Sequence, residues 1–261
     1  MLNASKANSE QVSATATSQA GQQTQSAQSA ASAAATPEKT KVPTKQSKPI
    51  STVSTKGPYG GTLALSDPLS SNNYGWQDFT DPNTGNSCHF LGGAYHVVAA
   101  GGGNTSGTCF AQKTDFTNFA YQVQMSFVKV GTKFSGGGIA FRGDSATSKY
   151  YYFEVFESGR YDFTGCFGPG KANCTYQIIG YPKQTGIVPA FNPVMGQPNT
   201  VAVVANGTTF DIYVNGQHAI GPITDSTFSH GMIGVYATGG IDPGVSQTAE
   251  VTFSNAKVWR L

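Results

Sequence analysis

The stretch GGGIAFRGDSATSKYYYFEVF, residues 136–156, decides the fold of this chain. Two apolar runs, 139–142 and 150–156, flank a short polar segment, which is the pattern of a β-hairpin. The polar segment begins with Gly143 and Asp144, two residue types that turns favour. The sequence therefore predicts two antiparallel strands joined by a short loop.

The second strand of this hairpin has two different faces. Successive side chains of a strand point to opposite sides of the sheet. One face is apolar (Tyr151, Phe153, Val155), and the other mixes rings, hydroxyls and a carboxylate (Tyr150, Tyr152, Glu154, Phe156). If the two strands pair, we expect Arg142 beside Glu154 on the mixed face. Two interpretations stay open: a surface that binds a polar ring such as a sugar, or an aromatic face covered by a loop, with Arg142 and Glu154 as a structural ion pair.

Composition divides the chain after residue 57. Residues 1–57 hold six Lys and two Glu, a net charge of +4, and no aromatic residue or cysteine. An Ala/Ser/Gln/Thr tract followed by a Pro/Lys tract buries too little apolar area to offset chain entropy, so we expect residues 1–57 to be a disordered linker. Residues 58–261 hold ten basic and twelve acidic side chains, a net charge of −2. They lack the basic stripe that nucleic-acid binding needs.

Residues 58–261 show the pattern of a single all-β domain. Short runs of Val, Ile, Phe, Tyr and Thr are closely spaced by turn residues, and no amphipathic helix is evident. Asn206-Gly207 and Asn215-Gly216 separate three alternating runs, and Asn-Gly is the strongest short hairpin signal. The sequence predicts a two-sheet sandwich or a barrel.

Four cysteines, at positions 88, 109, 166 and 174, suggest disulfides, because they are even in number and lack a C-x-x-C spacing. Of three possible connectivities we favour the nearest neighbours, Cys88–Cys109 and Cys166–Cys174; the alternative is four buried free thiols. Disulfides indicate an oxidising compartment. The chain starts MLNASKANSEQ, without the pattern of a secretory signal, and has no apolar run that could span a membrane. We therefore expect an extracellular or cell-surface protein without membrane insertion, whose export signal is not visible because the chain is a fragment or its start is misplaced.

Six segments of the predicted domain carry a resemblance: DFTNFAYQVQM, GGGIAFR, KYYYFEV, NTVAVVANGTTFDIYVNGQ, GMIGVYA and AEVTFSNAKVW. They resemble the concanavalin A-like lectin/glucanase jelly roll, and more closely its LamG-like and 3-keto-disaccharide hydrolase (DUF1080-like) branch. The resemblance covers about residues 60–261. Domains that look like this one occur in bacterial exported proteins and in the ectodomains of bacterial sensors. It implies an antiparallel jelly-roll sandwich with carbohydrate on a concave sheet face. By this resemblance Arg142 and the mixed face lie on that sheet.

Catalysis requires more than the mixed face offers. A glycosidase needs two carboxylates about 5–10 Å apart on one side of the scissile bond. Glu154 and Glu157 are three residues apart, which places them on opposite faces of a strand. The ExDxE-type arrangement of jelly-roll glucanases is therefore missing, and Glu154 is only a weak catalytic candidate. A partner acid would have to come from another strand, with Asp144, Asp162 and Asp211 as candidates.

The predicted function is therefore non-catalytic recognition of an extracellular polysaccharide or oligosaccharide. The predicted ligand-binding residues are Arg142, Tyr150, Tyr152 and Glu154, walled by a loop that carries Tyr181 and Phe191. A glycoside or 3-keto-disaccharide hydrolase is one alternative, and a structural or adhesive protein-binding module is the other.

No cofactor or metal site is indicated by the sequence. The four histidines, at 89, 96, 218 and 230, are scattered, without the spacing of a metal-binding motif. A structural Ca²⁺ is possible in this fold, but no ligand spacing points to one. The glycan and the oligomeric state are not decided by the sequence.

Overall fold

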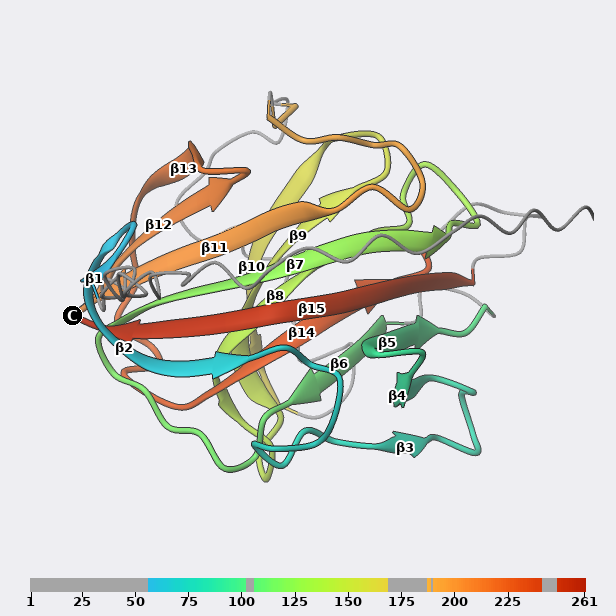
Figure 1. The fold of residues 1–261 in the computed structure, drawn as a ribbon, viewed down its shortest axis with the longest axis horizontal. Helices are drawn as coiled ribbons and strands as arrows, with labels where there is room; N and C mark the ends of the chain where they lie inside the picture. The colour runs from blue at the N-terminus through green and yellow to red at the C-terminus, as the bar shows by residue number, and fades with distance from the viewer. Residues whose placement is uncertain (1–55, 102–105, 169–186, 189, 241–247) are drawn as a thin grey trace, which may run out of the picture. The chain divides into compact units, whose positions relative to one another are not determined.

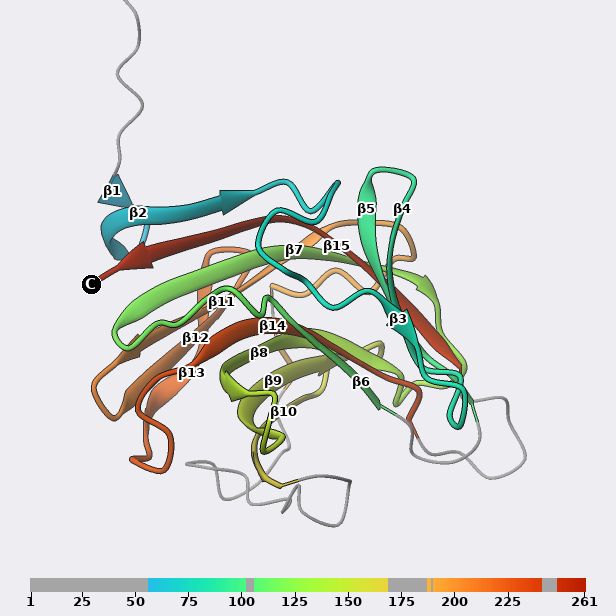
Figure 2. The same ribbon diagram turned by 90° about the horizontal axis from the view of Figure 1, so that it is seen from below.

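The computed structural model describes residues 56–101, 106–168, 187–188, 190–240 and 248–261. Within these ranges the chain forms two antiparallel sheets packed face to face, and no helix (Figures 1 and 2). This confirms the predicted two-sheet antiparallel jelly-roll sandwich. The described residues contain no helix that is long and apolar enough to cross a membrane.

The large sheet has β15 at its centre. β15 pairs with β7 on one side and with both β5 and β2 on the other, and the order along the sheet is β13-β12-β11-β7-β15-β5-β4-β3. The ten strands are β1 (Lys56–Gly57), β2 (Gly60–Asp67), β3 (Phe79–Thr80), β4 (Ser87–Leu91), β5 (Ala94–Ala99), β7 (Phe119–Lys129), β11 (Asn199–Asn206), β12 (Thr209–Val214), β13 (Gln217–Thr224) and β15 (Ala249–Arg260).

The small sheet contains the hairpin predicted from residues 136–156. Its order is β10-β9-β8-β14-β6, with the hairpin formed by β8 and β9. The strands are β6 (Ser106–Phe110), β8 (Gly136–Asp144), β9 (Lys149–Phe156), β10 (Tyr161–Phe167) and β14 (Met232–Thr238). Figure 2 shows this sheet as the lower layer, beneath the layer that holds β7 and β15.

The core lies between the two sheets and is strongly aromatic. Phe141 of β8 contacts the rings of Tyr151, Phe163 and Phe210, with centroids 5.5–5.9 Å apart. Tyr151 and Phe153 are fully buried in this cluster, which confirms the predicted apolar face of the second hairpin strand. Each fully buried side chain of this size contributes about 1.5–3 kcal/mol to stability.

The predicted Asn-Gly turns both connect antiparallel strands. Between β12 and β13, Asn215 and Gly216 have φ angles of 49° and 77°, the left-handed pair that a tight hairpin turn requires. The side chain of Asn215 also accepts from Thr200 N and donates to the carbonyl of Ala190, so this turn is tied to its neighbours.

Cys88 of β4 and Cys109 of β6 form a disulfide, as predicted. The bond links the large sheet to the small one. Cys166 is also disulfide-bonded, but its predicted partner, Cys174, lies outside the described residues. The second pair therefore stays a prediction.

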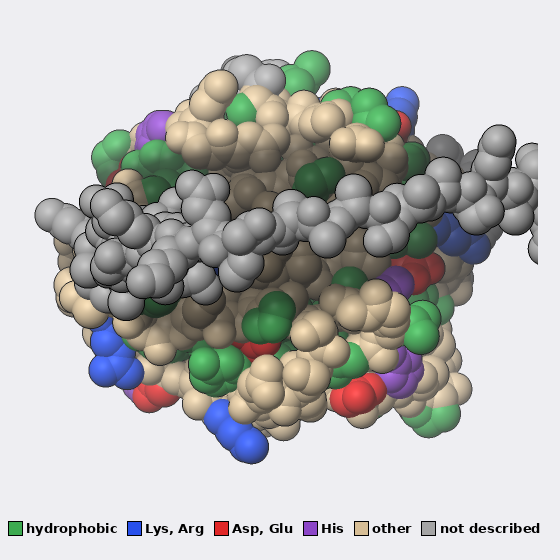
Figure 3. Space-filling view, viewed as in Figure 1, with side chains coloured by type: hydrophobic (Ala, Val, Ile, Leu, Met, Phe, Trp, Pro, Cys, Tyr) green, Lys and Arg blue, Asp and Glu red, His purple; other side chains and the backbone are tan. Residues whose placement is uncertain are grey.

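The predicted linker lies outside the described residues, except for its last two positions. Lys56–Gly57 form β1, which pairs with β2, so the strand pairing begins just before the predicted boundary at residue 58. On the face of the domain in Figure 3, basic and acidic side chains are scattered and do not gather into a patch of one sign.

Candidate functional site

The outer face of the small sheet carries the predicted mixed face. Strand register places residues from all five strands in one row across it: Thr108, Tyr236, Gly138, Glu154 and Asp162. The next row contains Phe110, Gly234, Ala140, Tyr152 and Thr164. We call the outward side chains of these rows, together with Tyr150, the tyrosine face.

The tyrosines of this face pack against one another. The rings of Tyr152 and Tyr236 stack with centroids 4.4 Å apart and planes 11° from parallel. The hydroxyl of Tyr150 lies 3.0 Å from that of Thr108. Tyr152 is only 4% exposed, and Tyr150 and Tyr236 are buried as well. In this conformation the rings offer little area for stacking on a sugar, so ligand binding by Tyr150 and Tyr152 stays a prediction.

Glu154 is a buried carboxyl group on the same face. Its side chain is 4% exposed, and its Oε2 has no hydrogen-bond partner. Burial, and then the charge of Asp162, raise the pKa of Glu154 well above its usual value, which favours the neutral, protonated form. Asp162 is directly opposite Glu154 on β10. Burial raises the pKa of Asp162 to about 6, although Arg160 opposes the shift. The structure therefore identifies the facing acid that the sequence left open.

Arg142 is not part of the tyrosine face. The β8–β9 register shifts between Phe141 and Asp144, and Arg142 has a φ of 49°. Such a β-bulge inserts an extra residue and re-aims the side chain. Arg142 is 2% exposed, and its guanidinium donates at 2.7–2.8 Å to three backbone carbonyls, those of Thr117, Gly207 and Phe228. The predicted placement beside Glu154, and the ion pair between them, are therefore wrong.

The two residues of the predicted wall do not reach the tyrosine face. Phe191 is buried in the core between the sheets, where its ring lies 6.0 Å from that of Phe127. Tyr181 lies outside the described residues.

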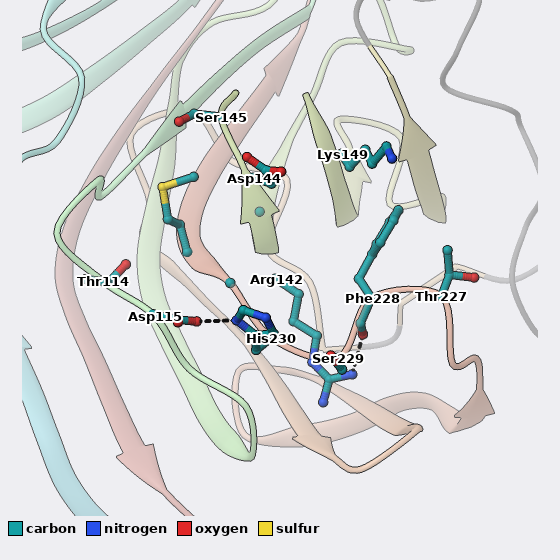
Figure 4. A pocket seen from close by; sticks show the side chains of 13 residues that line it. Thr114, Asp115, Arg142, Asp144, Ser145, Lys149, Thr227, Phe228, Ser229 and His230 are labelled. Atoms are coloured by element: carbon teal, nitrogen blue, oxygen red, sulfur yellow. Dashed lines mark hydrogen bonds and ion pairs between the residues drawn. The ribbon is translucent and has the colours of Figure 1, made fainter. Parts of the chain in front are cut away.

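An open hollow of about 510 Å³ lies at the end of the small sheet, and we call it the end pocket (Figure 4). Three segments that are distant in the sequence form it: 114–115 after β6, 142–149 at the β8–β9 turn, and 227–232 leading into β14. The lining residues are Thr114, Asp115, Arg142, Gly143, Asp144, Ser145, Lys149, Thr227, Phe228, Ser229, His230, Gly231 and Met232.

The two carboxylates of the end pocket have partners within the chain. Asp115 Oδ1 lies 2.8 Å from His230 Nδ1, the pair drawn with a dashed line in Figure 4. Asp144 accepts from Ala146 N at 3.0 Å and from Thr147 Oγ1 at 2.7 Å, and these bonds lower the pKa of Asp144. Lys149 is exposed at the rim.

Sequence reasoning named two residues of the end pocket, Arg142 and Asp144, but it assigned both to a site around Glu154. Arg142 was predicted as a binding residue, whereas Lys149, His230 and Asp115 were missed. Their meeting depends on the pairing of β14 with β8, where Met232 is opposite Gly143. No local pattern in the sequence gives this register.

No metal site is evident in the described ranges, where no group of three or more His, Cys, Asp and Glu residues could hold an ion. The Ca²⁺ considered from the sequence stays untested.

Comparison with known proteins identifies the fold of this chain. No family model and no curated protein matches the sequence. Among solved structures, the chain is similar to the carbohydrate binding module CBM66 from Bacillus subtilis, with 17% identity, 74% of this chain and 99% of that chain covered, and a TM-score of 0.51. A protein of unknown function with a galectin-like fold, also from Bacillus subtilis, shares 10% identity with this chain; the match covers 77% of this chain and 96% of that chain, with a TM-score of 0.51.

A third neighbour is the catalytic domain of an endo-1,3-β-glucanase from Thermotoga petrophila. It shares 13% identity with this chain, covers 77% of it and 98% of its own length, and has a TM-score of 0.51. At these identities the likeness concerns the fold alone. The chain therefore has the jelly-roll lectin/glucanase-like fold that the sequence resemblance implied.

Proposed function

We propose that this protein binds an oligosaccharide or polysaccharide, and that the end pocket is its binding site. The observation that carries the proposal is the lining of the pocket. The lining combines one ring, that of Phe228, with two cationic side chains, Arg142 and Lys149, and with the hydroxyl groups of Ser145, Thr227 and Ser229. A concave site of 300–1,000 Å³ with a few convergent polar groups is the usual form of a small-molecule site.

The fold supports this proposal. A carbohydrate binding module and a glucanase domain share the sandwich. A fold hosts many functions, so the lining of the pocket carries the proposal and the shared fold agrees with it.

The Cys88–Cys109 disulfide supports an extracellular or cell-surface location as part of the same proposal. Disulfides persist in oxidising compartments, where polysaccharides are also accessible to a binding module.

A binding panel with a blocked pocket tests the proposal. The full chain is titrated with neutral and acidic polysaccharides, and the supernatants are assayed for released sugar. Ser145→Trp fills the pocket from its exposed turn, and Ser71→Trp places the same ring on an exposed loop elsewhere. We expect the wild type to bind a polysaccharide without releasing sugar. Ser145→Trp should lose this binding, and Ser71→Trp should keep it. Equal binding by both variants would move the site away from the end pocket.

Glycoside hydrolysis is the second candidate function, and one observation favours it. Glu154 and Asp162 are opposite each other on adjacent antiparallel strands, where Cβ atoms are about 4.5–5.5 Å apart. Burial raises the pKa of both carboxyl groups, that of Asp162 to about 6, which is the direction that a general acid requires. We rank it second because Glu154 is buried, which denies a substrate access in this conformation. Sugar release by the wild type that disappears in Glu154→Gln would reverse this ranking.

A further inference from the structure

Arg142 places a positive charge beneath the end pocket without a counter-ion. All three acceptors of its guanidinium are neutral carbonyls, its other neighbour is the ring of Phe210 at 4.9 Å, and its Nε–H is buried and has no acceptor. Within the described part of the chain, no ion pair joins Arg142 to an acid. Burial lowers the pKa of Arg142, yet an arginine stays charged at any pH where the protein is folded. A buried charge is costly unless it is paired, and carbonyls and an aromatic ring offset that cost only in part, so the charge of Arg142 would attract an anion in the pocket.

Lys149 adds a second cation at the rim. Lys149 is opposite Asp144 in the β8–β9 register, and its charge contributes to the lowered pKa of that acid. The carboxylate of Asp144 already accepts hydrogen bonds from the β8–β9 turn, and the carboxylate of Asp115 is paired with the ring of His230. Both acids are exposed, so water screens them more than it screens the buried guanidinium. The unsatisfied groups of the pocket are therefore cationic donors.

We infer that the end pocket selects acidic sugars, and specifically sugars that carry a carboxylate, over neutral sugars. This inference rests on the proposed function and names its substrate class. The sugar carboxylate would lie above Arg142 and accept from Lys149, while the hydroxyls of the pocket and the ring of Phe228 would contact the sugar ring. Hydrogen bonds between charged partners are about twice as strong as neutral ones, which gives the selection its basis.

Calorimetric titration of the full chain at low salt tests the charge preference. The ligands are a trigalacturonate, a neutral galactose trisaccharide and a sulfated trisaccharide. We expect the trigalacturonate to bind at least about tenfold more tightly than the neutral sugar. Lys149→Gln should reduce that preference about two- to fivefold, and Lys129→Gln, an exposed lysine on the other sheet, should not. Tight binding of the sulfated sugar as well would support the anion site but overturn its restriction to carboxylates.

Each failure has a distinct meaning. Equal affinities for acidic and neutral sugars would overturn the inference and leave the proposed function standing. Equal losses of the preference for the acidic sugar in Lys149→Gln and Lys129→Gln would also overturn it. They would indicate a general attraction between the sugar and the surface lysines, without a specific site. If no trisaccharide binds, free galacturonate is added and the Arg142 Nε–H resonance is followed, which is tractable because the chain has three arginines. A shift of that resonance supports the anion site without polysaccharide binding, and an unchanged resonance overturns it.

Discussion

Replacing Arg142 by methionine tests whether its guanidinium holds this end of the sandwich together. The side chain joins three separate segments through the carbonyls of Thr117, Gly207 and Phe228, at 2.7–2.8 Å. Methionine fills part of the volume but donates no hydrogen bond. Three carbonyls then lose their donor in a partly buried setting, at about 1–3 kcal/mol each with values near the lower end expected.

The net loss is smaller than this sum, because methionine no longer carries a buried charge. We expect the free energy of unfolding to fall by about 3–5 kcal/mol, the lower part of that sum, because the carbonyls are only partly buried. For a domain of about 200 residues this lowers the melting temperature by about 6–20 °C. Lysine at this position keeps the charge but satisfies fewer carbonyls, so Arg142→Lys should fall between the wild type and Arg142→Met.

Urea denaturation followed by tryptophan fluorescence measures the change. Arg260→Met is the matched control, because Arg260 is exposed and contacts only the ring of Phe116 among the interactions described, at 5.6 Å from its centroid. Such an exposed cation–π contact is worth about 0.5–1 kcal/mol. If Arg142→Met lost no more stability than Arg260→Met, the claim that Arg142 staples three segments would be refuted.

Two further predictions concern the buried acids and the disulfide. Because the pKa of Glu154 is raised in the folded state, folding takes up a proton, and the free energy of unfolding falls as pH rises above the ordinary glutamate value of about 4.3. Glu154→Gln should flatten this fall between pH 5 and pH 8 in urea denaturation, and an equally steep fall in the variant would contradict the buried acid. The double variant Cys88→Ala/Cys109→Ala opens a loop with a sequence separation of 21, and should lose about 3 kcal/mol. An unchanged melting temperature would show that this disulfide does not stabilise the fold.

The fold was predictable because its signals are local. Alternation in residues 150–156 gave the faces of β9, and Asn215-Gly216 gave the turn between β12 and β13. Such patterns depend only on neighbours within a strand or a turn. The buried Tyr151 and Phe153 follow directly from them.

The bulge at Arg142 shows where alternation fails. Counting from Phe141 assigns Arg142 to the outer face, but the extra residue in the ladder turns its side chain under the end pocket. The sequence marks the position only by Gly143, and a glycine at the end of a strand is too common to specify a bulge. Site residues beyond the bulge could not be placed by face counting.

The position of Asp162 opposite Glu154 was easier to predict from the sequence than the lining of the end pocket. Tyr161 pairs with Val155 across a short turn, so Asp162 must be opposite Glu154 once β10 is recognised as the strand after β9. The end pocket needs the pairing of β8 with β14, which is separated from it by some 90 residues of chain. Local register follows from a turn, whereas distant register follows from the packing of the whole sandwich.

The two candidate sites have opposite electrostatics, and this bears on which of them can be functional. The tyrosine face holds a carboxyl group whose raised pKa favours the neutral form, so it can stay packed with no ligand present. The end pocket is open and lies over a guanidinium that has hydrogen bonds but no counter-ion. Of the two, only the end pocket is open to a ligand, which can contact the exposed Lys149 while the charge of the buried Arg142 acts on it from beneath. An anionic sugar therefore has a physical reason to bind there, whereas a ligand at the tyrosine face would first have to expose buried rings.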